Sequence, residues 1–433
     1  MAAKLDTSPP RGMRDILPDE VELRDATAAA ILDVYRRYGF RRVETPALED
    51  IRLLTRSEGG ENEKLIFKVL KRGEKLAHAE MVRIDDLVDL GLRFDLTVPL
   101  ARYYAENHAK LPQPLKSLQI GPVWRAERPQ KGRYRQFTQC DIDILGVESA
   151  HAEVELILAT LDALLTVGLT GLRVRLNDRR VLGALARHCG FAGERVGQVF
   201  VTLDKLDKIG VAGVRDELRG DGHPEAAVAR MIDVLERLER EGPALEHVRA
   251  LLGPDPDGVH GALHTIVRAV TAEARGRYTI EVDLSLVRGM GYYTGPIFEV
   301  AHSGYTSSIA GGGRYDRMIG KLLGREVPAC GFSIGFERLI EILKERRGPR
   351  DGGERRIAVL VDGQDDIATL VALARELREQ GQIVSLEPKR KNLGRQLEEL
   401  ATHGYGSYAV LRAPGALDVR PLARRTGKEE ARS

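Results

Sequence analysis

Cysteine is scarce in this sequence, whose 433 residues contain only Cys140, Cys189 and Cys330. None of the three has a partner at C-x-x-C spacing, so the sequence predicts neither a disulfide framework nor a cysteine-based metal site. Isolated cysteines of this kind are typical of small buried side chains in a reducing compartment.

Long apolar runs and an excess of one charge are also missing. No stretch reaches 18 apolar residues, and the N-terminus has no apolar signal core. The 66 Lys and Arg residues nearly balance the 64 Asp and Glu residues. Any contact with nucleic acid must therefore use a local basic patch. We expect a cytoplasmic protein of two or three domains with no membrane partner.

One local basic patch is present at residues 125–135, R-A-E-R-P-Q-K-G-R-Y-R, where five Lys or Arg residues accompany one Glu. Pro129 and Gly132 indicate a loop, and strand-like segments flank it at Leu118–Trp124 and Phe137–Leu145. Arginine forks bind phosphate oxygens bidentately, so this hairpin loop is typical of a polyphosphate site. Taken alone, the patch is equally compatible with an exposed basic hairpin that binds nothing.

The strand after the loop carries Gln139, Asp141 and Asp143 at every second position. Alternation places these three side chains on one face of the strand. Hydrogen-bond acceptors beside a phosphate-binding loop favour a site for a nucleotide and a small polar or cationic co-substrate.

Two later segments also combine glycine with arginine. Residues 284–300 contain an apolar strand, a glycine-rich turn with Arg288, and the pair Tyr292 and Tyr293. We expect Arg288 to lie on a strand rather than on a mobile loop. Residues 308–316, S-I-A-G-G-G-R-Y-D, place three glycines before Arg314, and we expect them to bring the backbone close to a ligand.

The spacing of apolar residues predicts an α+β protein. Strands alternate with isolated helices in a way that favours one large, mostly antiparallel sheet flanked by helices. Beyond a basic linker, the order strand, helix, strand, helix, strand predicts a small α/β domain with a parallel sheet. The expected parts are residues 1–176 (catalytic core, first part), 177–275 (helical insertion), 276–345 (core, second part), 346–356 (linker) and 357–433 (C-terminal α/β domain).

Several segments, taken in order, resemble the histidyl-tRNA synthetases, which are class II aminoacyl-tRNA synthetases. P-R-G-M-R-D from Pro10 and Y-G-F-R-R-V-E-T-P-A-L-E from Tyr38 resemble the family's N-terminal signature and dimer-forming motif. R-F-D-L-T-V-P-L-A-R from Arg93 resembles its amino-acid-binding strand. L-V-R-G-M-G-Y-Y-T-G from Leu286 is similar to the segment that marks the histidine enzymes, and G-F-S-I-G-F-E-R-L from Gly331 enters a helix with Arg338. The resemblance covers nearly the whole chain.

The resemblance implies a homodimeric histidine–tRNA ligase that uses ATP and Mg²⁺, with L-histidine and tRNA(His) as substrates. It implies no protein metal site, and its C-terminal domain would bind the anticodon. The catalytic residues it implies are Arg125 and Arg288. The histidine-binding residues are Asp95, Thr97, Arg125, Gln139, Asp143, Arg288, Tyr292 and Tyr293. The ATP-binding residues are Arg125, Glu127, Arg133, Arg314 and Arg338, and the tRNA-binding residues are Gln130 and Lys131.

The chain departs from the family pattern in two places. Gly291 stands where the family usually has an acidic residue, and the sequence after Leu411 is shorter than usual. Two alternatives therefore remain: a histidine-sensing regulatory subunit of ATP phosphoribosyltransferase, and an adenylating ligase with a non-tRNA acceptor. The regulatory subunit typically lacks the arginine at this position and the C-terminal domain, whereas this chain has Arg288 and at least most of that domain. The short C-terminus keeps the second alternative open.

Overall fold

The computed structural model divides the chain into two compact units, residues 1–342 and 343–433. It describes residues 6–56, 62–73, 76, 84–129, 133–193, 195–241, 245–252, 258–287, 292–346, 355–412 and 415–422. The predicted limits of the helical insertion, residues 177 and 275, both fall inside the first unit, and these limits stay a prediction.

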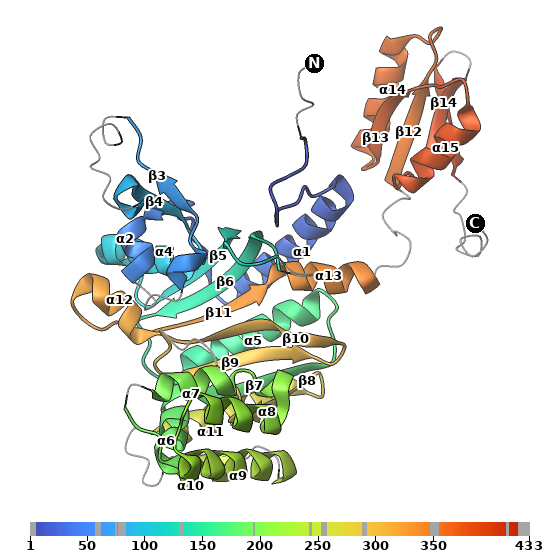
Figure 1. The fold of residues 1–433 in the computed structure, drawn as a ribbon. Helices are drawn as coiled ribbons and strands as arrows, with labels where there is room; N and C mark the ends of the chain where they lie inside the picture. Colours follow the sequence, from blue (N-terminus) through green and yellow to red (C-terminus); the bar gives the residue numbers. More distant parts are fainter. Residues whose placement is uncertain are drawn as a thin grey trace. The chain divides into compact units, whose positions relative to one another are not determined.

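An eight-stranded sheet lies at the centre of the first unit, in the order β1-β5-β6-β11-β10-β9-β7-β8 (Figure 1). Every neighbouring pair from β5 to β7 is antiparallel, while β1 and β8 pair in parallel at the two edges. The predicted antiparallel sheet is thus confirmed. The strands are β1 (Arg41–Arg42), β5 (Leu115–Trp124), β6 (Gln136–Leu145), β11 (Ala329–Gly335), β10 (Tyr305–Arg314), β9 (Pro296–His302), β7 (Leu172–Asp178) and β8 (Tyr278–Val282).

Helices cover one face of this sheet. Helix α5 (His151–Thr166) packs against β6 and β11, and α1 (Pro18–Arg37) and α11 (Val259–Ala274) pack against α5. In β6, Cys140 is buried beside Tyr35 of α1, so the even-numbered positions of the strand face the helices. The odd-numbered positions therefore face the opposite side of the sheet.

The segment that carries Asp95 follows a strand of a second, three-stranded sheet. The order of this sheet is β2-β4-β3, and α2 and α4 lie beside it (Figure 1). Apolar residues of α4 and α12 share one buried cluster with Leu115 and Leu145 of the large sheet. The elements are β2 (Leu48–Asp50), α2 (Ile51–Arg56), β3 (Lys68–Leu70), β4 (Val88–Leu92), α4 (Thr97–Asn107) and α12 (Asp316–Leu323), with short 3-10 helices at 62–65, 84–87 and 108–110.

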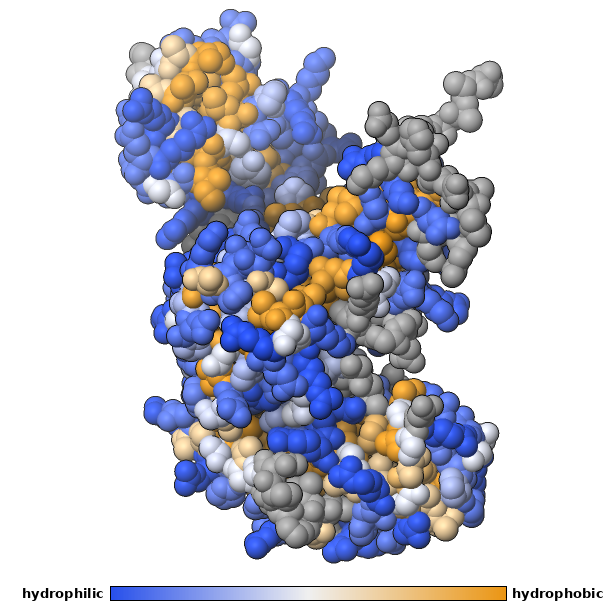
Figure 2. Space-filling view, turned by 90° about the vertical axis from the view of Figure 1, so that its left-hand side faces the viewer, coloured by the Kyte–Doolittle hydropathy of each residue, from blue (hydrophilic) through white to orange (hydrophobic). Residues whose placement is uncertain are grey.

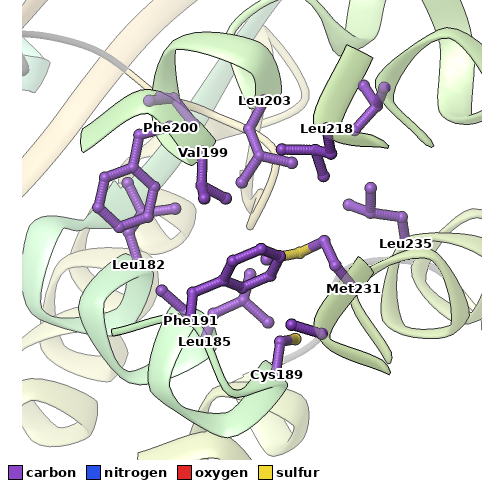
Figure 3. Close-up of a cluster of buried hydrophobic side chains, with 14 of the residues drawn as sticks. Leu182, Leu185, Cys189, Phe191, Val199, Phe200, Leu203, Leu218, Met231 and Leu235 are labelled. Atoms are coloured by element: carbon purple, nitrogen blue, oxygen red, sulfur yellow. The ribbon is translucent and has the colours of Figure 1, made fainter. Parts of the chain in front are cut away.

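A helical block interrupts the sheet between β7 and β8. Its helices build a separate apolar core from α6, α7, α8 and α9, with Phe191 and Met231 at its centre (Figure 3). The strong amphipathic spacing of Val228, Met231 and Leu235 explains why this segment is helical and buries one face. The helices before α11 are α6 (Arg179–Cys189), α7 (Val196–Leu203), α8 (Leu206–Gly220), α9 (Glu225–Glu241) and α10 (Leu245–Leu252).

The glycine run and the segment before Arg288 each have a local structure that the sequence did not show. Gly311, Gly312 and Gly313 lie inside strand β10, where Gly311 lines the cavity described below. A Cβ atom on Gly312 would lie 2.1 Å from the carbonyl oxygen of Gly331 in β11, so close strand packing requires the glycine. Residues 284–287, which we expected to form a strand, form turns and irregular backbone.

The second unit is a four-stranded sheet in the order β13-β12-β14-β15. The three predicted strands pair in parallel, but β15 is an additional antiparallel strand that the sequence analysis missed. Buried clusters on both faces of the sheet involve α14 and α15. The elements are β12 (Arg356–Val361), α14 (Ile367–Glu379), β13 (Ile383–Pro388), α15 (Leu393–Thr402), β14 (Ser407–Arg412) and β15 (Ala416–Pro421).

The surface is mainly hydrophilic with scattered apolar patches, as one face of the molecule shows (Figure 2). Exposed large apolar side chains of the second unit include Ile367 and Val371 on α14. Among the described residues, no helix combines the length and apolarity needed to cross a membrane.

Candidate functional site

A cavity of about 520 Å³ lies on the face of the large sheet opposite α5. Residues from β6, β10 and β11 line it, together with the basic loop between β5 and β6 and the segments that follow β4 and precede β9. Ten side chains predicted for substrate binding line this one cavity: Asp95, Thr97, Arg125, Glu127, Arg133, Gln139, Asp143, Tyr292, Tyr293 and Arg338.

Strand β6 supplies three buried acceptors to the cavity. Gln139 Oε1, Asp141 Oδ1 and Asp143 Oδ2 are buried atoms with no hydrogen-bond partner among the described residues. The other oxygen of Asp143, Oδ1, accepts a 2.6 Å hydrogen bond from the Tyr315 hydroxyl. A ligand that offers several N–H donors would satisfy this row, because buried acceptors without partners are strongly disfavoured.

Burial alters the acidity of these carboxyl groups. It raises the pKa of Asp143 to about 7, against the lowering effect of the Tyr315 hydrogen bond. It also raises the pKa of Asp141, and the neighbouring Asp143 carboxylate adds to that rise. A cationic ligand would favour the ionised forms of both groups.

Asp95 lies at the start of a helix, which corrects the expectation that Asp95 and Thr97 lie on a strand. Strand β4 ends at Leu92, and α4 begins at Thr97. The Asp95 Oδ1 atom accepts a 3.0 Å hydrogen bond from the Val98 backbone N–H, as a helix-capping residue does. Burial nevertheless raises the pKa of Asp95 to about 6.

Arg125 follows the last residue of β5 and is held in place by the backbone. Its Nε donates a 3.0 Å hydrogen bond to the Phe94 carbonyl oxygen, next to Asp95. Its guanidinium lies 5.1 Å from the centre of the Phe137 ring. The backbone N–H of Arg125 also donates to the Arg135 carbonyl oxygen at 2.8 Å, which closes the base of the basic loop.

Arg338 reaches the cavity from the first turn of α13 (Phe336–Arg346), where its Nη1 donates to the Ser308 carbonyl oxygen at 2.6 Å. The preceding residue, Glu337, also lines the cavity. Its carboxylate forms ion pairs with Arg24 at 2.7 Å and Arg14 at 3.2 Å. Although burial favours the neutral acid, Arg24 keeps the pKa of Glu337 below its usual value.

Sequence analysis missed two residues that shape this cavity, Tyr315 and Glu337, which are direct neighbours of predicted arginines. Alternation had placed Asp141 on the same strand face as Gln139 and Asp143, but the resemblance gave it no role. The contacts of Tyr315 and Glu337 span 172 and 313 residues, so no local pattern shows them.

Arg314 is placed differently from Arg125, Arg133 and Arg338, which line the cavity. It does not line the cavity; its Nε and Nη2 bind the buried Glu153 carboxylate at 2.6 and 3.0 Å. Its Nη1 donates to the Val147 carbonyl oxygen at 3.0 Å. The guanidinium thus binds other parts of the protein and does not face the cavity, which corrects the expectation that it binds ATP.

Three predicted site residues, Arg288, Gln130 and Lys131, lie outside the described residues, as does Gly291. Within the described ranges, no group of three or more His, Cys, Asp or Glu side chains could hold a metal ion. A cation in this cavity would therefore need oxygen atoms from a bound substrate as well.

The sequence model of the histidyl-tRNA synthetase family matches residues 12–339. The chain is also 46% identical to the histidine–tRNA ligase of Leifsonia xyli, over 96% of this chain and 98% of that one. This chain belongs to the histidyl-tRNA synthetase family. The resemblance drawn from its motifs is thereby confirmed.

Other family members agree with this assignment. The histidine–tRNA ligase of Aeropyrum pernix is 42% identical over 77% of this chain and 73% of its own. The crystal structure of histidyl-tRNA synthetase from Nostoc sp. PCC 7120 superimposes with a TM-score of 0.75 at 26% identity, covering 96% of this chain and 97% of that one. A Bacillus halodurans protein described as an ATP phosphoribosyltransferase regulatory subunit/histidyl-tRNA synthetase shares the fold at 22% identity, also with a TM-score of 0.75.

Proposed function

We propose that this chain is a histidine–tRNA ligase, which joins histidine to ATP as histidyl-adenylate and then transfers the histidyl group to tRNA. The strongest structural support is the single cavity that brings buried acceptors and arginines together. Relatives named histidine–tRNA ligase match most of the chain at 40% identity or more.

In the first step, a carboxylate oxygen of histidine attacks the α-phosphorus of ATP, and pyrophosphate leaves. Negative charge grows on the α-phosphate oxygens, so fixed cations at that point accelerate the reaction. Arg125 and Arg288 are the cations we assign to this charge. The hydrogen bond from Arg125 Nε to the Phe94 carbonyl oxygen supports a fixed orientation. Arg133 and Arg338 would hold the remaining phosphates.

Recognition of histidine uses the row of acceptors. Asp95, Thr97 and Gln139 would bind the α-ammonium group, and Asp143 the imidazole. The free acceptor atoms of Gln139 and Asp143 support this division. The rings of Tyr292 and Tyr293, whose centres lie 4.3 Å apart, would pack against the imidazole. An analogue without ring N–H groups would leave Asp143 unpaired and bind poorly.

Magnesium suits this cavity as a companion of ATP. Mg²⁺ is usually bound by one or two carboxylates and by substrate phosphates, so the lack of a three-residue cluster among the described side chains does not oppose it. Glu127 is our candidate ligand because it is the cavity-lining carboxylate of the basic loop. The bound ion would neutralise phosphate charge.

In the second step, a hydroxyl of the terminal tRNA ribose attacks the histidyl carbonyl carbon, and AMP leaves. We assign Gln130 and Lys131 to the arriving acceptor end, because the stems of their loop carry Arg125, Glu127 and Arg133, which line the cavity. Gln130→Ala should lower aminoacylation while pyrophosphate exchange stays close to wild type. Equal loss of both activities would place Gln130 in the adenylation site.

A homodimer that works in the cytoplasm completes the proposal. Strand β1 is an edge strand, and the chain reaches Pro46 shortly after it. Proline lacks a backbone N–H and is favoured at strand ends, where a second subunit can pack. Sedimentation equilibrium at micromolar concentration should give twice the chain mass, and a monomer would contradict the proposal.

One experiment separates the proposal from its two alternatives. Pure protein is incubated with radiolabelled histidine, ATP and total tRNA, and charged tRNA is the expected product. Pyrophosphate exchange without charging would indicate a ligase with another acceptor. Histidine binding without exchange would indicate a regulatory subunit; the C-terminal α/β unit argues against that outcome.

A further inference from the structure

The segment just before Arg288 is buried in the core of the helical block. Leu286 and Val287 are 4% and 2% exposed, although they follow the sheet strand β8 in the chain. Both belong to the same buried apolar cluster as the side chains of α6, α7, α8 and α9. The helical block therefore encloses the two residues that lead into Arg288.

The same cluster also reaches the chain after residues 288–291. Ile297 of β9 is fully buried in it, and Tyr293 packs against it. Tyr293 lines the substrate cavity as well. The apolar core of the helical block thus contacts both flanks of the segment that carries Arg288.

Polar contacts fix the first flank independently. Asn177 of β7 is fully buried, and its Nδ2 donates a 3.0 Å hydrogen bond to the Leu286 carbonyl oxygen. The next residue, Asp178, caps α6 by accepting a 2.8 Å bond from the Arg180 N–H. The first helix of the block and the carbonyl of Leu286 are therefore held by two consecutive residues.

A partly buried arginine holds the residues just before this point. Arg175 of β7 forms ion pairs with Asp283 at 2.5 Å and Glu299 at 2.8 Å, and it donates to the Ser285 hydroxyl at 3.1 Å. The backbone N–H of Asp283 donates to the Leu176 carbonyl oxygen at 2.7 Å. Residues 283–287 are thus anchored by backbone, polar and apolar contacts, although they form no strand.

We propose that Asn177, Leu286 and Val287 are positioning residues that set the location of Arg288, so that the helical block supports adenylation itself. This inference rests on the proposed catalytic role of Arg288. A cation stabilises a transition state only if it is held near the developing charge, and a displacement of about 1 Å can reduce the rate about 100-fold. The block would matter in the first half-reaction, before any tRNA is bound.

The test compares two valines of one cluster. Val287 and Val228 are both buried in it, at 2% and 0% exposure, but only Val287 is bonded to Arg288. Val287→Ala and Val228→Ala should lower the melting temperature similarly. We expect Val287→Ala to lower kcat for pyrophosphate exchange about 10-fold or more with KM for ATP unchanged, and Val228→Ala to stay within about twofold of wild type.

A double mutant tests whether the loss of activity in Val287→Ala acts through Arg288. If Val287 acts through Arg288, Val287→Ala combined with Arg288→Ala should be no slower than Arg288→Ala alone. If the double mutant instead lost kcat by the product of the two single losses, the inference would be overturned. Equal kcat values for Val287→Ala and Val228→Ala would also overturn it. If the alanine variants do not fold, Val287→Ile and Val228→Ile test the same contrast by overpacking. Absence of exchange in the wild type, or near-normal exchange in Arg288→Ala, would instead refute the proposed function.

Discussion

Substituting Gly331 by alanine should weaken histidine recognition while leaving the fold and the ATP site in place. Gly331 lies in β11 directly opposite Asp143 of β6. A Cβ atom at Gly331 would lie 2.1 Å from Asp143 Oδ1, where ordinary contact begins at 3.4 Å. The carboxylate must therefore move by more than 1 Å, and it would lose its 2.6 Å hydrogen bond from Tyr315.

The loss can be estimated from the interaction that Asp143 would make. A hydrogen bond to a charged group contributes about 1.5–3 kcal/mol, which corresponds to about a 10- to 150-fold rise in KM for histidine. KM for ATP should change little, because no ATP-binding arginine is among the nearest atoms to this Cβ. Pyrophosphate exchange at varied histidine and varied ATP measures both constants.

Gly312→Ala provides the matched control. Its Cβ would also overlap at 2.1 Å, but with the backbone carbonyl oxygen of Gly331 rather than with a side chain. Strands β10 and β11 would have to separate, so we expect a loss of folding stability of about 3 kcal/mol or more in urea titration. A Gly331→Ala variant with normal KM for histidine would refute the placement of Asp143 at the imidazole. So would a Gly331→Ala variant as unstable as Gly312→Ala.

Three further predictions concern charged side chains. Arg288→Ala should lower pyrophosphate exchange about 10²–10³-fold and largely spare ATP binding; exchange within a few-fold of wild type would exclude its catalytic role. Arg314→Met should lower the free energy of unfolding by about 3–5 kcal/mol, because it leaves the buried Glu153 unpaired, without raising KM for ATP at permissive temperature. Asp143→Asn should stabilise the protein against urea at pH 8 but not at pH 4. The Asp143 pKa rises from an ordinary 3.8 to about 7 on folding, so its carboxylate destabilises the fold increasingly as pH rises between those values. An equal effect of Asp143→Asn at both pH values would contradict this.

Local sequence patterns were sufficient to predict an element where the spacing of its own residues determines its structure. Helix α14 (Ile367–Glu379) follows the first strand after the linker, as the predicted order requires, and Asp366 caps it by accepting hydrogen bonds from the backbone N–H groups of Ala368 and Thr369. The hairpin of β5 and β6 also forms around the basic loop as predicted. Strand β15 was missed, although Leu417 and Val419 alternate with Asp418 and Arg420. Six residues of alternation between a glycine and a proline do not by themselves distinguish a short strand from a loop.

The sequence alone determined the family and ten of the side chains that line the cavity, because these depend on residue types at fixed spacing along short segments. It could not determine the partner of Arg314, since Glu153 is 161 residues away and only the packing of α5 on the sheet brings it there. It could not determine that Gly312 lets β10 approach β11 while Gly311 lines the cavity, because both close approaches are favoured by backbone without a Cβ. The burial that raises the pKa values of Asp95 and Asp143, and the enclosure of Leu286 and Val287 by the helical block, likewise arise only when distant segments pack together.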